Sequence, residues 1–172
     1  MSKNIIKVRI GGGMQAYYSG RLIKHGFLAL VVALIAGFLL IFSMIGGMSL
    51  SPVPILIEFE LPGGVEGWRV VHVGMLMNSI MAIAIGAAMR TVHLEESAAY
   101  RVYMGTAIAI WCNFMFYLFG MFAPNRGVTL EANRLGEASL AGAAAFIPAL
   151  IGSVTLIYAA VVMWRSEANT TS

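Results

Sequence analysis

The sequence predicts an all-α integral membrane protein with four transmembrane helices and both termini in the cytoplasm. Hydrophobic residues make up 59% of the 172 residues and charged residues only 11%, which is far from the composition of a soluble domain. The mean hydropathy is +0.83. Four apolar runs each reach the length of about 20 residues that a helix needs to cross a bilayer, and they lack the alternating pattern of a membrane β-barrel. The runs span residues 26–48, 70–89, 102–122 and 138–164.

The distribution of basic residues predicts the orientation. Eight of them precede the first run, lie between the second and third runs, or follow the fourth, and three lie in the other two loops. The positive-inside rule therefore places both termini in the cytoplasm, and we expect a multi-pass protein of the bacterial inner membrane. The pI is about 9.2. Attraction of the basic residues to anionic lipid explains this excess of positive charge, so it does not indicate a nucleic-acid partner. The first group is Lys3, Lys7, Arg9, Arg21, Lys24, Arg90, Arg101 and Arg165, and the second is Arg69, Arg126 and Arg134.

The predicted organisation is a single four-helix domain over residues 26–165. A cytoplasmic N-terminal segment, residues 1–25, precedes it and a short tail, residues 166–172, follows it. We expect no cleavable signal peptide, because the first apolar run is too long for one. The single cysteine, Cys112, lies within the third run and cannot form an internal disulfide.

Four polar side chains within the apolar runs are candidates for a site. His72 and Asn78 lie in the second run, and Asn113 and Tyr117 lie in the third. Asn113 and Tyr117 are one helical turn apart, so they share a helix face. Such groups either hydrogen-bond between helices as structural contacts or form a site, and the residues alone leave both interpretations open.

His72 is the strongest candidate site residue. An ionisable side chain within a membrane span is a functional-site hypothesis by default, and neutral imidazole is a common metal ligand. His25 and His93 border the opposite ends of the runs, roughly 30 Å from His72, and are expected to be interfacial residues. A haem with two histidine ligands within one subunit is therefore disfavoured, as is a zinc site, because no Cys/His cluster is present. A single histidine with an open opposite face suits a five-coordinate haem. The alternative is an interfacial histidine bonded to a backbone group or a glutamate.

Several short motifs occur in order along the chain. The first is Gly67-Trp68-Arg69-Val70-Val71-His72 with Gly74 and Asn78, and it follows the loop elements Ile57-Glu58-Phe59 and Pro62-Gly63. The second comprises Trp111, Asn113 and Phe116-Tyr117-Leu118-Phe119, then Pro124-Asn125-Arg126-Gly127 and Asn133. Together these motifs resemble the styrene oxide isomerases, from about His25-Gly26 to the fourth span. The first 20 or so residues look like an extension.

The resemblance implies a specific function. Members of this family are small membrane enzymes that form homotrimers and bind haem b between subunits. They convert an aryl epoxide, such as styrene oxide, to an aldehyde, such as phenylacetaldehyde, by a Meinwald rearrangement in which ferric iron is a Lewis acid. On this basis His72 is the axial iron ligand, and Asn78 and Tyr117 place the epoxide oxygen. We expect functional coupling to an epoxide-forming monooxygenase.

Helix geometry constrains this assignment. Asn78 lies about 120° around the helix from His72 and about 9 Å along it. The two side chains therefore do not readily face the two sides of one haem. A haem at a subunit interface removes the difficulty, since His72 of one chain ligates while Asn78 and Tyr117 of its neighbour face the open side.

One position departs from the family pattern, which has an aspartate two positions before the tryptophan of the third span. This sequence has Ala109 there and contains no aspartate. If that carboxylate orients the substrate or holds a tyrosine, substrate range or rate differs in this protein.

Two other classes of function remain open. A non-catalytic or electron-carrying membrane cytochrome b subunit would need a second axial ligand, which the histidine positions disfavour. A small transporter or assembly factor without a cofactor would leave His72 structural.

Overall fold

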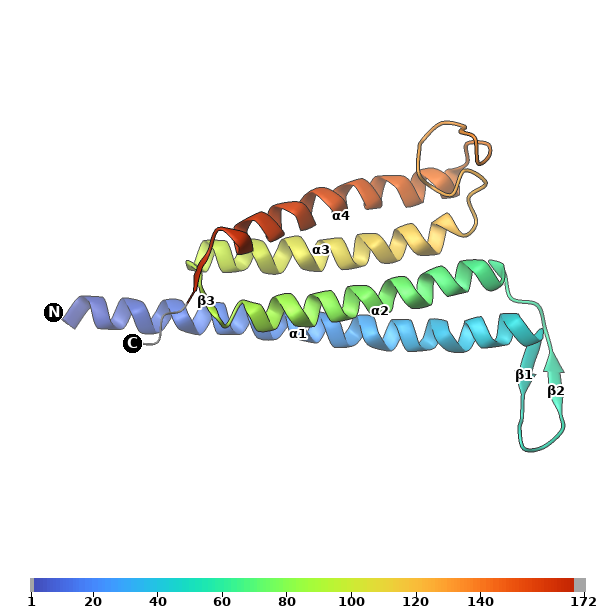
Figure 1. The fold of residues 1–172 in the computed structure, drawn as a ribbon, viewed down its shortest axis with the longest axis horizontal. Coiled ribbons are helices and arrows are strands. Elements are labelled where there is room, and N and C mark those ends of the chain that lie inside the picture. The colour runs from blue at the N-terminus through green and yellow to red at the C-terminus, as the bar shows by residue number, and fades with distance from the viewer. Residues whose placement is uncertain (1, 169–172) are drawn as a thin grey trace.

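The computed structural model describes residues 2–168 and shows an all-helical bundle (Figure 1). The helices are α1 (Ser2–Ile45), α2 (Gly64–Ala88), α3 (Glu96–Gly120) and α4 (Leu140–Trp164). Short antiparallel pairs connect β1 (Gly47–Ser49) with β2 (Leu56–Glu58), and β3 (Val92–His93) with β4 (Glu167–Ala168). All four helices are long and apolar enough to cross a membrane, which confirms the four predicted apolar helices, and their insertion in a membrane stays a prediction.

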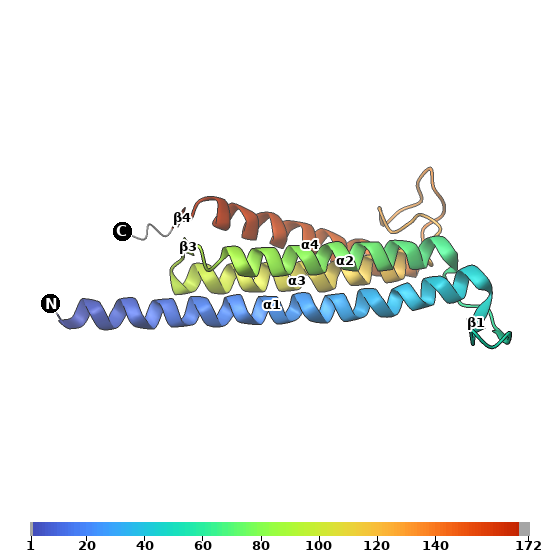
Figure 2. The same ribbon diagram turned by 60° about the horizontal axis from the view of Figure 1, so that its bottom comes forward.

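The bundle consists of two helix pairs. α1 lies along α2 and α3 lies along α4, and α3 also contacts both α1 and α2 (Figures 1 and 2). The two ends of the chain lie at one end of the bundle, and the β1–β2 hairpin and the loop between α3 and α4 lie at the other. The four helices alternate in direction, so the chain returns to the end of the bundle at which it starts.

The outer surface of the bundle is apolar. Large hydrophobic side chains are more than half exposed on different helices, for example Phe38 at 61%, Met77 at 62% and Ile157 at 65%. Water would penalise this exposure, whereas lipid does not. The surface is therefore typical of a multi-pass membrane protein.

Small residues let the helices approach closely. Ala29, Ala33 and Ala36 on α1 are buried, and a Cβ on Gly26 would lie 3.1 Å from the Ser79 carbonyl oxygen of α2. Between α3 and α4, a Cβ on Gly105 would lie 2.8 Å from the Thr155 carbonyl oxygen. Packing of this kind holds helices together where the surrounding lipid is as apolar as the helices.

Helix α1 crosses residue 25 without interruption. The Ser19 hydroxyl donates to the Gly86 carbonyl at 2.7 Å, and the Gln15 side chain donates to the Val92 carbonyl at 2.7 Å and accepts from the Leu94 amide at 3.2 Å. The later part of the predicted N-terminal segment therefore packs on the end of α2 and the turn that follows. Its location in the cytoplasm stays a prediction.

The close approach at Gly105 can be tested. Gly105→Ala should lower the free energy of unfolding by about 1–3 kcal/mol, because α4 must move away from the new methyl group. Gly20→Ala on α1 is the matched control, since a Cβ there meets nothing within 4 Å. The measurement is thermal unfolding in detergent, and equal stability of the two variants would contradict this packing.

Candidate functional site

His72 lies against α1, not against the other polar side chains of the spans. Its Nδ1 is 2.8 Å from the carbonyl oxygen of Ala33. A Cβ on Gly37 would lie 3.0 Å from both Cε1 and Nδ1 of the ring. The absence of a side chain at Gly37 therefore gives the imidazole access to the backbone of α1.

This hydrogen bond determines which ring nitrogen of His72 carries the hydrogen. A carbonyl oxygen can only accept, so Nδ1 carries the hydrogen, and in neutral imidazole Nε2 then has a free lone pair. Metal-ligating histidines almost always use the other ring nitrogen in this way, with a backbone carbonyl or carboxylate as the acceptor. The half-buried His72 therefore has the environment of a histidine ligand.

Asn78 joins α2 to α3 through a network of side chains. Its Oδ1 accepts from the Asn113 amide at 2.9 Å, and its Nδ2 donates to the Gly74 carbonyl at 2.9 Å and to the Tyr117 hydroxyl at 3.5 Å. Asn78 is 4% exposed. The bond from Asn113 fixes the orientation of the Asn78 amide, so that its donor group faces the phenol.

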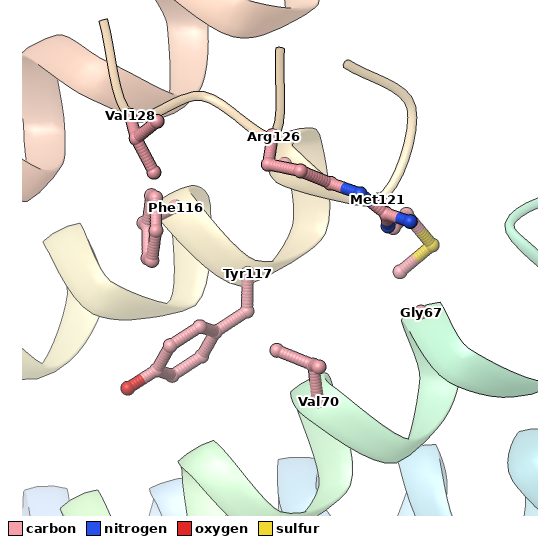
Figure 3. A pocket seen from close by; sticks show the side chains of 8 residues that line it. Gly67, Val70, Phe116, Tyr117, Met121, Arg126 and Val128 are labelled. Carbon is pink, nitrogen blue, oxygen red and sulfur yellow. The ribbon is translucent and has the colours of Figure 1, made fainter. Parts of the chain in front are cut away.

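The Tyr117 ring packs directly on the backbone of α2. A Cβ on Gly74 would collide with the ring and would lie 2.7 Å from its Cζ. Figure 3 shows the side chain of Tyr117 projecting from α3 toward α2, with Val70 facing it. The glycine thus lets the phenol lie beside Asn78.

A cavity of about 180 Å³ lies next to Tyr117, between α2, α3 and the loop that follows α3 (Figure 3). Its walls are mostly apolar, with the Arg126 side chain as the charged exception. Arg126 has a left-handed backbone conformation with φ of 59°. The lining residues are Gly67, Val70, Phe116, Tyr117, Gly120, Met121, Arg126 and Val128.

The loop over this cavity is held in place by a buried asparagine. Asn125 is fully buried, and its Nδ2 donates to the carbonyl oxygens of Thr129 at 2.9 Å and Glu131 at 3.1 Å. Its Oδ1 accepts from the Gly127 amide at 3.1 Å. Residues 125–131 are thereby closed into a turn beside the cavity.

The structure thus brings two of the three predicted site residues together. Asn78 and Tyr117 meet at the contact of α2 with α3, with Asn113 as a third member, whereas His72 contacts α1. The different partners of His72 and Asn78 agree with their calculated separation around α2. Among the described residues, no three His, Cys, Asp or Glu side chains lie together as a metal-binding group.

Ala109 lies one helical turn before Asn113 on α3 and packs against α4. It is fully buried, and a Cβ on Gly152 of α4 would lie 3.4 Å from its Cα and its carbonyl oxygen. The position that differs from the family pattern therefore forms part of the close contact between α3 and α4.

A second polar group, around His25, was not predicted from the sequence. The indole Nε1 of Trp111 donates to His25 Nδ1 at 3.1 Å, and His25 Nε2 lies 3.4 Å from the Tyr103 hydroxyl. The available signal was the spacing of Tyr103 and Trp111, which are two turns apart and so share a face of α3.

Comparison with known proteins identifies the family. The family model described as styrene oxide isomerase matches residues 18–168. The chain belongs to the styrene oxide isomerase family. It is 31% identical to the styrene-oxide isomerase of Pseudomonas fluorescens over 139 residues, and this aligned region covers 80% of each chain. The protein is an isomerase, and its family supports an epoxide isomerase function. His72, Asn78 and Tyr117 lie within the matched range, and residues 1–17 precede it.

The contribution of the asparagine pair to stability is measurable. Asn113→Leu should lower the free energy of unfolding by about 1–3 kcal/mol, because it leaves the buried Oδ1 of Asn78 without this donor. Ser153→Ala on α4 is the control, since that exposed hydroxyl bonds only to its own helix at Ala149. Thermal unfolding of both variants is the measurement. If Asn113→Leu were as stable as the control, the asparagine pair would not stabilise the helix contact.

Proposed function

We propose that this isomerase converts aryl epoxides such as styrene oxide to aldehydes such as phenylacetaldehyde, with ferric haem b as its cofactor. The observation that carries the proposal is the hydrogen bond from His72 Nδ1 to the Ala33 carbonyl. It leaves Nε2 available as a ligand, and it holds the ring in one orientation.

The residues present fit a haem better than a bare metal ion. A porphyrin brings four nitrogen ligands of its own, so one histidine completes a five-coordinate site. His72 is such a histidine, and a bare ion would need a group of ligands that is absent from the described residues. His72 would hold the haem iron through Nε2.

The partition of the polar residues supports a site shared between subunits. His72 contacts α1, whereas Asn78 and Tyr117 lie between α2 and α3. In the proposed homotrimer, His72 of one chain would hold the haem, and Asn78 and Tyr117 of a neighbouring chain would face the substrate. The trimer would thus bring His72 and the pair Asn78 and Tyr117 to opposite sides of one haem, which a single copy of α2 does not.

The proposed reaction is a Meinwald rearrangement. The benzylic C–O bond breaks, the oxygen stays on the terminal carbon, and a hydride moves from that carbon to the benzylic position to give the aldehyde. Atoms and electrons balance without an external reductant or base. When bound, the haem iron would supply a Lewis acid for the epoxide oxygen.

The residues of the chain would position the epoxide and exclude water from it. The phenol of Tyr117 accepts from Asn78 and so keeps its own hydrogen to donate to an oxygen on which negative charge develops. The Asn78 amide would donate to the same oxygen in place of its long 3.5 Å contact with Tyr117. Asn113 would keep the Asn78 donor in place. The apolar walls of the adjacent cavity would accept the aryl ring and exclude water, which would otherwise convert the ring-opened epoxide to a diol.

The proposed location is the bacterial inner membrane with both termini in the cytoplasm. The excess of basic residues at the end of the bundle that holds the termini supports this orientation. An apolar epoxide would partition into the same bilayer, and a monooxygenase that forms epoxides from aryl alkenes would supply it.

The absorption spectrum of the detergent-purified protein tests the cofactor. The expected result is a Soret band of five-coordinate ferric character that is lost or altered in His72→Ala, together with conversion of styrene oxide to phenylacetaldehyde. A six-coordinate low-spin spectrum would instead favour an electron-carrying cytochrome b subunit. A protein with no Soret band after expression with added haem would contradict the haem proposal.

Mixed trimers test the shared site. His72→Ala and Tyr117→Phe subunits are each expected to have low activity alone. Co-assembled in equal amounts, they should restore about one quarter of the sites, because a site then needs an intact His72 from one chain and an intact Tyr117 from the next. Activity of the mixture no higher than that of the separate variants would place both residues in the same subunit.

A further inference from the structure

A second and larger cavity lies between α1, α3 and α4. It is an open groove of about 460 Å³, within the range of ligand sites. None of the residues Asn78, Asn113 and Tyr117 lines it. The groove is therefore separate from the proposed catalytic network. Its walls include His25 of α1, Tyr103, Ala107, Trp111 and Met115 of α3, and Ile151 of α4.

The groove runs along the helices from the end of the bundle that holds the termini. Its wall on α3 extends from Tyr103 to Met115, which is about 18 Å at 1.5 Å per residue. Half of the hydrocarbon core of a bilayer is about 15 Å thick. The groove thus has the length of one acyl chain in one leaflet.

The polar groups within the groove are already paired with one another. His25 Nδ1 accepts from Trp111, and its Nε2 lies 3.4 Å from the hydroxyl of Tyr103. These contacts leave little for a polar ligand to bind inside the groove. Its other walls are apolar side chains of the kind that contact lipid tails.

The mouth of the groove carries a positive charge. Arg21 lies one turn before His25 on α1, and its guanidinium contacts the hydroxyls of Tyr103 at 3.5 Å and Tyr17 at 3.3 Å. Within residues 2–168, the ion pair between side chains is that of Arg69 with Glu66, so Arg21 forms no ion pair with a carboxylate in this part of the chain. Lys24 is exposed and three residues further along the helix, so it adds charge on the same side.

The length of α1 places Arg21 at the level of lipid headgroups. The apolar part of this helix, Gly13–Ile45, has 33 residues. At 1.5 Å per residue it is about 50 Å long, whereas the hydrocarbon core is about 30 Å thick. Its first turns therefore extend into the headgroup region on the side of the termini.

We propose that this groove binds one acyl chain of an anionic phospholipid of the inner leaflet, such as phosphatidylglycerol, with the phosphate at Arg21. Charge complementarity at the mouth and the length of the apolar groove support this occupant. The proposal rests on the membrane placement given above, but it is independent of haem and of the reaction.

Fluorescence quenching by brominated lipids tests the proposal, because Trp111 lies in the groove. The full-length Trp68→Phe/Trp164→Phe protein keeps Trp111 as its single tryptophan. It would be reconstituted in phosphatidylcholine vesicles that contain brominated phosphatidylglycerol or brominated phosphatidylcholine. Brominated phosphatidylglycerol should quench Trp111 with about fivefold higher apparent affinity, the preference that one arginine near the surface gives. Comparison with unbrominated vesicles cancels any quenching by haem.

Arginine variants assign the preference to the mouth of the groove. Arg21→Gln should reduce the fivefold preference to about equal quenching by the two lipids. Arg101→Gln is the matched control, because Arg101 is exposed at the same end of the bundle but donates to the Ser97 carbonyl of its own helix, whereas Arg21 contacts Tyr103 of the groove wall. A preference that Arg101→Gln removes and Arg21→Gln leaves intact would overturn the proposal.

A second tryptophan reports on the membrane itself. Trp164 at the end of α4 is 80% exposed, and a Trp68→Phe/Trp111→Phe protein should be quenched by both lipids. If Trp164 were quenched and Trp111 were not, a second copy of the chain or another protein would cover the groove, which overturns the proposal. If neither were quenched, the membrane placement itself would be wrong. Phosphatidylglycerol retained by the purified wild-type protein, measured by mass spectrometry, should also fall in Arg21→Gln and not in Arg101→Gln.

Discussion

The hydrogen bond between His72 and the Ala33 carbonyl is the interaction on which the proposed active site depends. That carbonyl already accepts the backbone amide of Gly37 within α1, as in any α-helix, and a second lone pair remains for the imidazole. Most side chains at position 37 would cover it. The bond therefore requires a glycine on α1, close packing of α1 on α2, and a histidine at one position of α2. A change in the distance between α1 and α2 would break this bond and change the orientation of the His72 imidazole.

Asn78 of α2 and Tyr117 of α3 are also positioned by the need to pair polar groups inside an apolar bundle. An unpaired amide is costly in an apolar interior. Asn113 and the Gly74 carbonyl reduce this cost by engaging both ends of the Asn78 side chain. The same bonds aim its donor group at Tyr117. The contacts that stabilise two helices against each other would thus also prepare hydrogen-bond donors for an epoxide oxygen, so the structural and the catalytic interpretations of these residues are compatible.

Much of the fold follows from the sequence, because bilayer thickness sets the length of an apolar run and polar residues within such a run stand out. His72, Asn78, Asn113 and Tyr117 were found in this way. A backbone partner for His72 was one of the alternatives, and the structure has one, but the sequence did not identify Ala33 as the acceptor, since every residue has a backbone carbonyl. The continuity of α1 was also not predicted. Gly11, Gly12 and Gly13 favour a break by their low helix propensity, yet the helix passes through them, and from Gln15 onward its contacts with the end of α2 stabilise it.

The His25 group shows a different limit of sequence analysis. A histidine at the border of an apolar run is expected to face the headgroups, but α3 brings Trp111 and Tyr103 against His25. Only the packing of α3 between α1 and α4 reveals this contact, and the same packing creates the groove beside it.

Resonance Raman spectroscopy of the reduced, haem-loaded protein tests the central claim most directly, because it observes the bond between iron and histidine. We expect an iron–histidine stretching band that shifts with the iron isotope and is absent from His72→Ala. The band should also move in Gly37→Ala, whose new methyl group displaces the ring, and stay unchanged in Gly20→Ala. An iron–histidine band that persists in His72→Ala would show that another residue ligates the haem.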